Sequence, residues 1–118
     1  VETFATDVLG KEAIRSTDRT GFLVNALLMP YLISAIRMLE NGHQSPEVID
    51  QAMVRGCSHP VGPLRLSDLI GLDVVVSISN ALFEEFKEPL YAPPPLLVRM
   101  VEGGRLGKKS GQGFYAYG

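Results

Sequence analysis

Hydrophobic residues dominate the segment 21–40 on nearly every side of a helical projection. A helix with this pattern is buried in a core or between subunits. Asn41-Gly42 follows the segment and predicts its end. Pro30 lies inside the segment and removes one backbone donor, so we expect it to kink the helix. The pattern therefore predicts one long buried helix over 21–40.

Two shorter helices are predicted after it. Ser45 is a suitable N-cap and Pro46 suits a first turn, so a helix is expected over 46–56. Its apolar stripe consists of Val48, Ile49, Ala52 and Met53. Gly62-Pro63 then begins a third helical element, which carries Leu64, Leu66, Leu69 and Ile70.

The segment 72–86 fits two patterns. Val74, Val76 and Ile78 alternate as in a strand, whereas Val75, Ile78, Leu82 and Phe86 have helical spacing. The length of the segment favours a helix.

The prolines at 93–95 predict an extended loop, which leads into a short helix over 96–102. The residues at 113–117 predict an extended tail whose rings pack on the helices.

The residues before this helical region have a different pattern. Residues 4–11 resemble the end of a helix, and 13–16 resemble a short strand. We therefore expect residues 1–19 to be the tail of a preceding α/β unit and the hinge that follows it. The fold class expected for residues 20–118 is an all-α domain.

Composition excludes several classes of protein. The net charge of −2 argues against a nucleic-acid-binding face. One cysteine, Cys57, cannot form an internal disulfide and suits a reducing, cytoplasmic setting. No His/Cys cluster has metal-ligand spacing. The apolar segment is interrupted by Asn25, Pro30 and Ser34 and is followed by Arg37, so we favour a buried helix over a membrane span.

Asn25 is the most informative polar residue because it lies inside the apolar segment. A buried amide must find hydrogen-bond partners, since unpaired polar groups are costly in a core. Two interpretations are open: the amide ties two helices together, or it binds the oxygen of a substrate. The helix N-terminus would favour partial negative charge close to it.

Other candidate residues carry weaker signals. His43 lies in a polar loop and His59 precedes Pro60, and neither has a carboxylate at a spacing that predicts an oriented base. Gly111 and Gly113 do not form a dinucleotide loop, because no strand precedes them and no helix follows. A small basic cluster could meet a phosphate or could be a solvated loop; it consists of Arg105, Lys108 and Lys109.

Three segments together resemble the 3-hydroxyacyl-CoA dehydrogenases, especially the bacterial 3-hydroxybutyryl-CoA type. The first is Gly-Phe-Leu-Val-Asn at 21–25. The second is His-Pro-Val-Gly-Pro at 59–63, continued by Asp-Leu-Ile-Gly-Leu-Asp at 68–73. The third is Leu-Gly-Lys-Lys-Ser-Gly-Gln-Gly-Phe-Tyr at 106–115. Their order and separations match the family over nearly all of residues 13–118.

The resemblance implies a helical C-terminal domain of the 6-phosphogluconate-dehydrogenase C-terminal-like kind, which shapes an acyl-CoA site and forms a homodimer. It also implies that NAD and the catalytic His/Glu pair belong to a missing N-terminal Rossmann-like domain, so the isolated chain should be inactive. Asn25 matches the family's active-site asparagine. Four residues are expected near the acyl pocket: Pro60, Gly62, Pro63 and Leu66. The family often has Pro and Arg where this chain has Thr20 and Ala26, so substrate chain length is open. The alternative is a helical dimerisation module without a substrate role.

Overall fold

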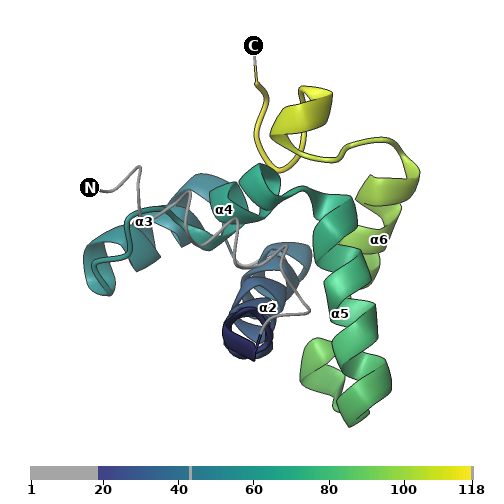
Figure 1. The fold of residues 1–118 in the computed structure, drawn as a ribbon. Helices are drawn as coiled ribbons and strands as arrows, with labels where there is room; N and C mark the ends of the chain where they lie inside the picture. The colour runs from purple at the N-terminus through teal and green to yellow at the C-terminus, as the bar shows by residue number, and fades with distance from the viewer. Residues whose placement is uncertain (1–18, 43, 118) are drawn as a thin grey trace.

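The computed structural model describes residues 19–42 and 44–117, which are folded into helices joined by short loops (Figure 1). The elements in chain order are α2 (Arg19–Glu40), α3 (Pro46–Gly56), α4 (Pro63–Ile70), α5 (Leu72–Phe86), the 3₁₀ turn η1 (Pro89–Tyr91), α6 (Pro95–Glu102) and the 3₁₀ turn η2 (Lys108–Ser110). The all-α fold class is thus confirmed for the described residues. The expected strand at 13–16, the helix end at 4–11 and His43 lie outside them.

Helix α2 is the centre of the fold. It packs against α4 and α5, with further contacts to α3 and α6 (Figure 1). Met29, Leu32, Ile33 and Ile36 are completely buried along its inner face. These positions recur at intervals of three and four residues, which places them on one side of a helix. The long helix expected over 21–40 is therefore confirmed and begins slightly earlier, but it is buried along this inner face only.

Helices α3 and α4 begin as the sequence predicts. The Ser45 hydroxyl accepts the Val48 N–H at 3.4 Å, and Pro46 occupies the first turn of α3. Pro63 occupies the first turn of α4, and Gly62 is the residue before it. Neither proline costs a helical hydrogen bond, because the first N–H groups of a helix have no partner in the helix.

The segment 72–86 is helical, which settles its conflicting pattern. The buried positions of α5 are Leu72, Val75, Ser79 and Leu82, at helical spacing. Helices α4 and α5 meet at an angle of 96° on either side of Gly71, whose φ of +106° lies in a region that favours glycine. This bend lets α4 and α5 pack on different sides of α2.

The C-terminal region closes over the ends of the helices. Helix α6 begins at Pro95, one residue before the expected start, and Glu40 of α2 accepts the Leu96 N–H at 2.8 Å. The tail after η2 has isolated bridges joining Gln112 to Gly107 and to Ala116. Its rings pack on α4, with the Arg65 guanidinium 4.2 Å from the centre of the Tyr115 ring. The expected packing of the tail rings is confirmed.

By length and composition, one described helix could cross a membrane, the stretch from Phe22 to Glu40 within α2. The bent pair of α4 and α5 passes the same test only when it is taken as one span. Core helices of globular proteins have the same composition when they are buried on most sides. In this fold 33% of this stretch is buried, along the inner face of α2, and several apolar side chains on its outer side are exposed.

Candidate functional site

Asn25 lies on the first half of α2, and its side chain is almost completely buried, with 2% exposed. Among the described residues, no donor forms a hydrogen bond with its Oδ1 atom. Buried amide oxygens are normally paired, because loss of hydration without a replacement costs about 1–3 kcal/mol. Within the described residues Oδ1 therefore does not tie two helices together, which leaves this oxygen open to a donor from elsewhere.

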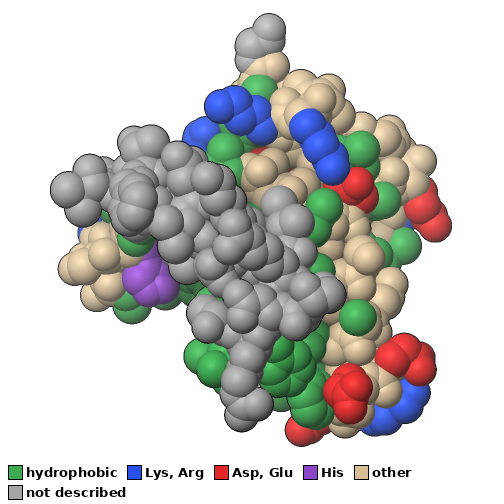
Figure 2. Space-filling model, in the orientation of Figure 1, with side chains coloured by type: hydrophobic (Ala, Val, Ile, Leu, Met, Phe, Trp, Pro, Cys, Tyr) green, Lys and Arg blue, Asp and Glu red, His purple; other side chains and the backbone are tan. Residues whose placement is uncertain are grey.

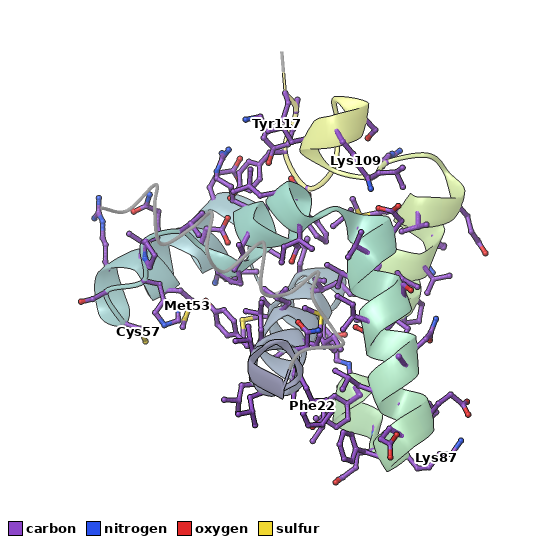
Figure 3. The ribbon with its side chains drawn as sticks, viewed as in Figure 1. Phe22, Met53, Cys57, Lys87, Lys109 and Tyr117 are labelled. Carbon is purple, nitrogen blue, oxygen red and sulfur yellow. The ribbon has the colours of Figure 1, made fainter. Side chains whose placement is uncertain are left out.

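Asn25 also lines a cavity of about 310 Å³ between α2 and α5, which we call the Asn25 cavity. Phe22 contributes from α2 and points toward α5 (Figure 3). The lining residues on the opposite side belong to α5: Ser77, Ile78, Ala81, Leu82 and Glu85. The cavity thus combines apolar walls with a few polar groups, which is usual for small-molecule sites.

The predicted substrate residues Pro60 and Leu66 line a different cavity, of about 370 Å³, which we call the His59 cavity. It lies between α2 and the loop and helix formed by residues 59–66. Its remaining lining is Val24, Leu27, Leu28, Tyr31, His59 and Val61. The structure therefore does not bring Asn25 together with Pro60 and Leu66 in one cavity. Their assignment to the substrate site stays a prediction.

Tyr31 and His59 form the polar contact of the His59 cavity. The Tyr31 hydroxyl is 2.9 Å from His59 Nδ1, and the two rings meet edge to face. Burial, together with the charges of Asp50 and Cys57, raises the pKa of Tyr31 to about 12. Tyr31 is therefore neutral at physiological pH, and its hydroxyl can donate to the imidazole. This contact holds the His59 ring in place.

Gly62 and Pro63, the other two predicted substrate residues, have a clear structural role at the start of α4. The buried Asp50 of α3 accepts the N–H groups of Leu64 and Arg65 at 2.8 and 3.0 Å. A side chain at Gly62 would overlap with Asp50. Asp50 thus caps α4 from another helix, and Gly62 leaves the space for it. Pro63 is buried and lines a third, apolar cavity beside α3.

Asp50 and Asp68 are important residues that the sequence reasoning missed. Asp68, with 1% exposed, accepts the N–H groups of Phe114 and Tyr115 and the Tyr117 hydroxyl. Burial raises its pKa, while these hydrogen bonds and the charge of Arg65 act in the opposite direction. In each case the sequence did contain a signal for such a role, because the aspartate lies beside the apolar positions of a predicted helix. Both aspartates anchor other segments and line neither cavity.

The basic cluster at 105–109 is partly engaged within the fold. Lys109 Nζ forms an ion pair of 2.6 Å with Asp73 at the start of α5, and Lys109 lies beside that helix in Figure 3. The hydrogen bond from Lys109 above all, together with the charge of Lys109, lowers the pKa of Asp73, although burial acts in the opposite direction. Arg105 and Lys108 are exposed. The ion pair accounts for Lys109 without a phosphate ligand.

The tail glycines have a packing role, and the described residues contain no cluster of metal ligands. Gly111 and Gly113 lie in the tail, and a side chain at Gly113 would overlap with Asp68, so this glycine serves close packing. No group of three His, Cys, Asp or Glu side chains in the described ranges could hold a metal ion. Cys57 is exposed at the end of α3 (Figure 3).

The family model for the C-terminal domain of 3-hydroxyacyl-CoA dehydrogenase matches residues 21–117. A 3-hydroxybutyryl-CoA dehydrogenase of Mycobacterium tuberculosis is 65% identical over 116 residues, which cover 98% of this chain and 41% of the relative. A probable 3-hydroxybutyryl-CoA dehydrogenase of Deinococcus radiodurans is 44% identical, with 99% of this chain and 42% of the relative covered.

Solved structures give the same result. The crystal structure of FadB2 from M. tuberculosis matches with a TM-score of 0.82 and 59% identity, over 92% of this chain and 41% of that one. An (S)-3-hydroxybutyryl-CoA dehydrogenase from Ralstonia eutropha matches with a TM-score of 0.77 and 45% identity, over 80% of this chain and 33% of that one. The chain thus spans well under half the length of these relatives.

Proposed function

This chain belongs to the 3-hydroxyacyl-CoA dehydrogenase family and corresponds to the C-terminal domain of these enzymes. From this premise, we propose that it forms the substrate-binding and dimerisation part of a cytoplasmic enzyme. That enzyme would interconvert 3-hydroxyacyl-CoA and 3-oxoacyl-CoA by hydride exchange with NAD. The relatives named as 3-hydroxybutyryl-CoA dehydrogenases support a short acyl group as the substrate.

The observation that carries the substrate role is the unpaired Oδ1 of Asn25 beside the Asn25 cavity. A 3-hydroxyacyl group has a hydroxyl on C3 that can donate to this oxygen, and the amide nitrogen could donate to the carbonyl of the 3-oxo form. Asn25 would thus hold the C3 oxygen in both oxidation states. Its burial restricts the positions open to the side chain, so the substrate would be oriented as well as bound.

NAD would be bound outside the described residues, where it accepts or supplies the hydride. The described part of this chain has no glycine-rich nucleotide loop. The one histidine among the described residues, His59, forms a hydrogen bond with Tyr31. We therefore expect the general base to come from the N-terminal part of the enzyme. This chain would contribute the amide contact to C3 and the cavity that excludes water from the acyl group.

The direct test is reduction of acetoacetyl-CoA with NADH by the complete enzyme, followed through NADH absorbance. We expect turnover by the complete enzyme and none by residues 1–118 alone. Activity of the isolated chain would contradict the division of roles. An inactive complete enzyme that binds NAD and is folded would contradict the substrate assignment. A parallel assay with NADPH measures the cofactor preference.

A homodimer is the second part of the proposal, and the outer side of α2 supports it. Leu27 is 78% exposed, Leu23 54% and Met38 47%, although all three are apolar. Val48 on α3 is also exposed, and an apolar cavity of about 320 Å³ is lined by residues of both α2 and α3. Figure 2 shows hydrophobic side chains gathered at the lower side of the molecule, by the end of α2 that faces the viewer.

A second copy could cover this surface through twofold contacts, which are common in homo-oligomers. Light scattering of the complete enzyme should give twice the mass of one chain, and Leu27→Glu should give a monomer because it buries a charge. A monomeric wild-type enzyme at high concentration would contradict this part of the proposal. An enzyme that dimerises but does not require Asn25 would favour the alternative of a pure association module.

A further inference from the structure

Two of the cavities beside α2 are lined by residues from its first half, and their chemistry differs. The His59 cavity is the larger, at about 370 Å³, and its lining is apolar except for the Tyr31–His59 contact. The Asn25 cavity, of about 310 Å³, contains an unpaired amide oxygen that is almost completely buried. Volume alone would favour the first cavity for an acyl chain, whereas the position of the amide favours the second.

The geometry of the reaction decides between them. Under the proposed function, Asn25 contacts the oxygen on C3, and a hydrogen bond joins atoms about 3 Å apart. C4 and later carbons are bonded in sequence to C3, so the first of them must lie beside Asn25 as well. Asn25 lines the cavity against α5 and does not line the His59 cavity. A chain seated in the His59 cavity would draw C3 away from the amide.

We propose that the α5 wall of the Asn25 cavity sets the acyl chain length, with Ala81 and Ile78 as the specificity-determining residues. This inference rests on the proposed function and adds the residues that select the substrate. Ala81 presents only a methyl group to the cavity and leaves room for the terminal carbons of a short acyl chain. Ile78 presents a branched side chain that limits the room further along α5.

The remaining lining supports a short acyl group. Ser77 and Glu85 are polar and exposed on the same wall, and Leu82 is buried beneath it. Burial of each further CH₂ group is worth about 0.8 kcal/mol only when the group meets an apolar surface. A chain that extends along Ser77 or Glu85 gains little of this energy. The cavity is also near the lower limit of about 300–1,000 Å³ that ligand sites occupy.

The test is a chain-length profile of the complete enzyme, measured as kcat/KM for 3-hydroxyacyl-CoA thioesters from butyryl to decanoyl. Ala81→Leu should reduce kcat/KM for hexanoyl and longer thioesters about tenfold more than for the butyryl thioester, because an added methylene can change discrimination by roughly 10–200-fold. Ile78→Ala should raise the ratio of decanoyl to butyryl kcat/KM about tenfold by the same reasoning.

Matched variants in the other cavity provide the control. Val61 lines the His59 cavity, so Val61→Phe reduces the space there and should leave the chain-length profile unchanged. Ala81 is exposed, and leucine is a good helix former, so Ala81→Leu should fold. Because Ile78 packs partly against the core, Ile78→Val serves as a milder second variant, with a smaller shift in the same direction.

The outcomes separate this inference from the proposed function. A shifted profile for Val61→Phe with an unchanged one for Ala81→Leu would place the acyl chain in the His59 cavity and overturn the inference. Unchanged profiles for both Ala81→Leu and Ile78→Ala would also overturn it. A wild-type enzyme that acts on none of the thioesters would instead contradict the proposed function.

Discussion

The Tyr115 hydroxyl donates a hydrogen bond of 2.6 Å to Asp50 and thereby joins the C-terminal tail to α3. The two oxygens of the same carboxylate accept the N–H groups of Leu64 and Arg65 at the start of α4. One buried side chain therefore connects two consecutive helices with the C-terminal tail, which is far from them in the sequence. Because hydrogen bonds to a charged group are stronger than neutral ones, this connection should contribute measurably to stability.

Tyr115→Phe tests this connection. The variant keeps the ring over Arg65 but removes the hydroxyl, so we expect a loss of about 1.5–3 kcal/mol in the free energy of unfolding. Denaturant unfolding at neutral pH measures it. In a double-mutant cycle with Asp50→Ala, the two losses should not add, since each variant removes the contact between the Tyr115 hydroxyl and the Asp50 carboxylate. Additive losses would show that the hydroxyl acts elsewhere.

Glycine 62 should tolerate no side chain. Gly62→Ala places a Cβ atom against Asp50 and should destabilise the fold by about 1–3 kcal/mol, the usual cost of overpacking. Gly56→Ala is the matched control, because Gly56 is the last residue of α3 and a side chain there meets open space. It should be neutral or stabilise the fold by up to about 1 kcal/mol. Equal effects of the two variants would contradict this account of Gly62.

Asn25→Ala should separate activity from stability. Its Oδ1 atom has no partner among the described residues, so loss of this oxygen breaks no hydrogen bond there, and the free energy of unfolding should fall by no more than about 1 kcal/mol. Turnover of the complete enzyme should fall about 10²–10³-fold, as when one preorganised hydrogen-bonding group is removed from an active site. Unchanged turnover in a folded variant would favour the pure association module.

Tyr31→Phe should change the alkaline stability in a defined direction. The pKa of Tyr31 is raised from 10.0 to about 12 in the folded chain, so the unfolded chain loses this proton first as pH rises. The contribution of Tyr31 is complete below pH 10 and declines as the pH rises through about 12. The stability difference between wild type and Tyr31→Phe should therefore shrink over this window. Unfolding curves across it provide the measurement, and a constant difference would contradict the raised pKa.

Local sequence signals were sufficient to predict the helices. The boundaries of α3, α4 and α5 follow from local signals: the Ser45-Pro46 start, the Gly62-Pro63 start and the length of the 72–86 segment. Such signals act within a few residues, so they can be recognised without knowledge of the fold. The buried position of Asn25 was also expected, because an amide inside an apolar helix is carried into the core with its neighbours.

Which residues share a site depends on how the helices pack, and local signals do not specify this. Asn25 and Pro60 belong to different cavities because Asn25 lies on the side of α2 that faces α5, whereas Pro60 lies against another side of α2. No local pattern specifies how the helices are oriented toward one another. The roles of Asp50 and Asp68 likewise depend on partners from the C-terminal tail. Hydrophobic periodicity fixes which face of a helix is buried, whereas packing across the core fixes what that face meets.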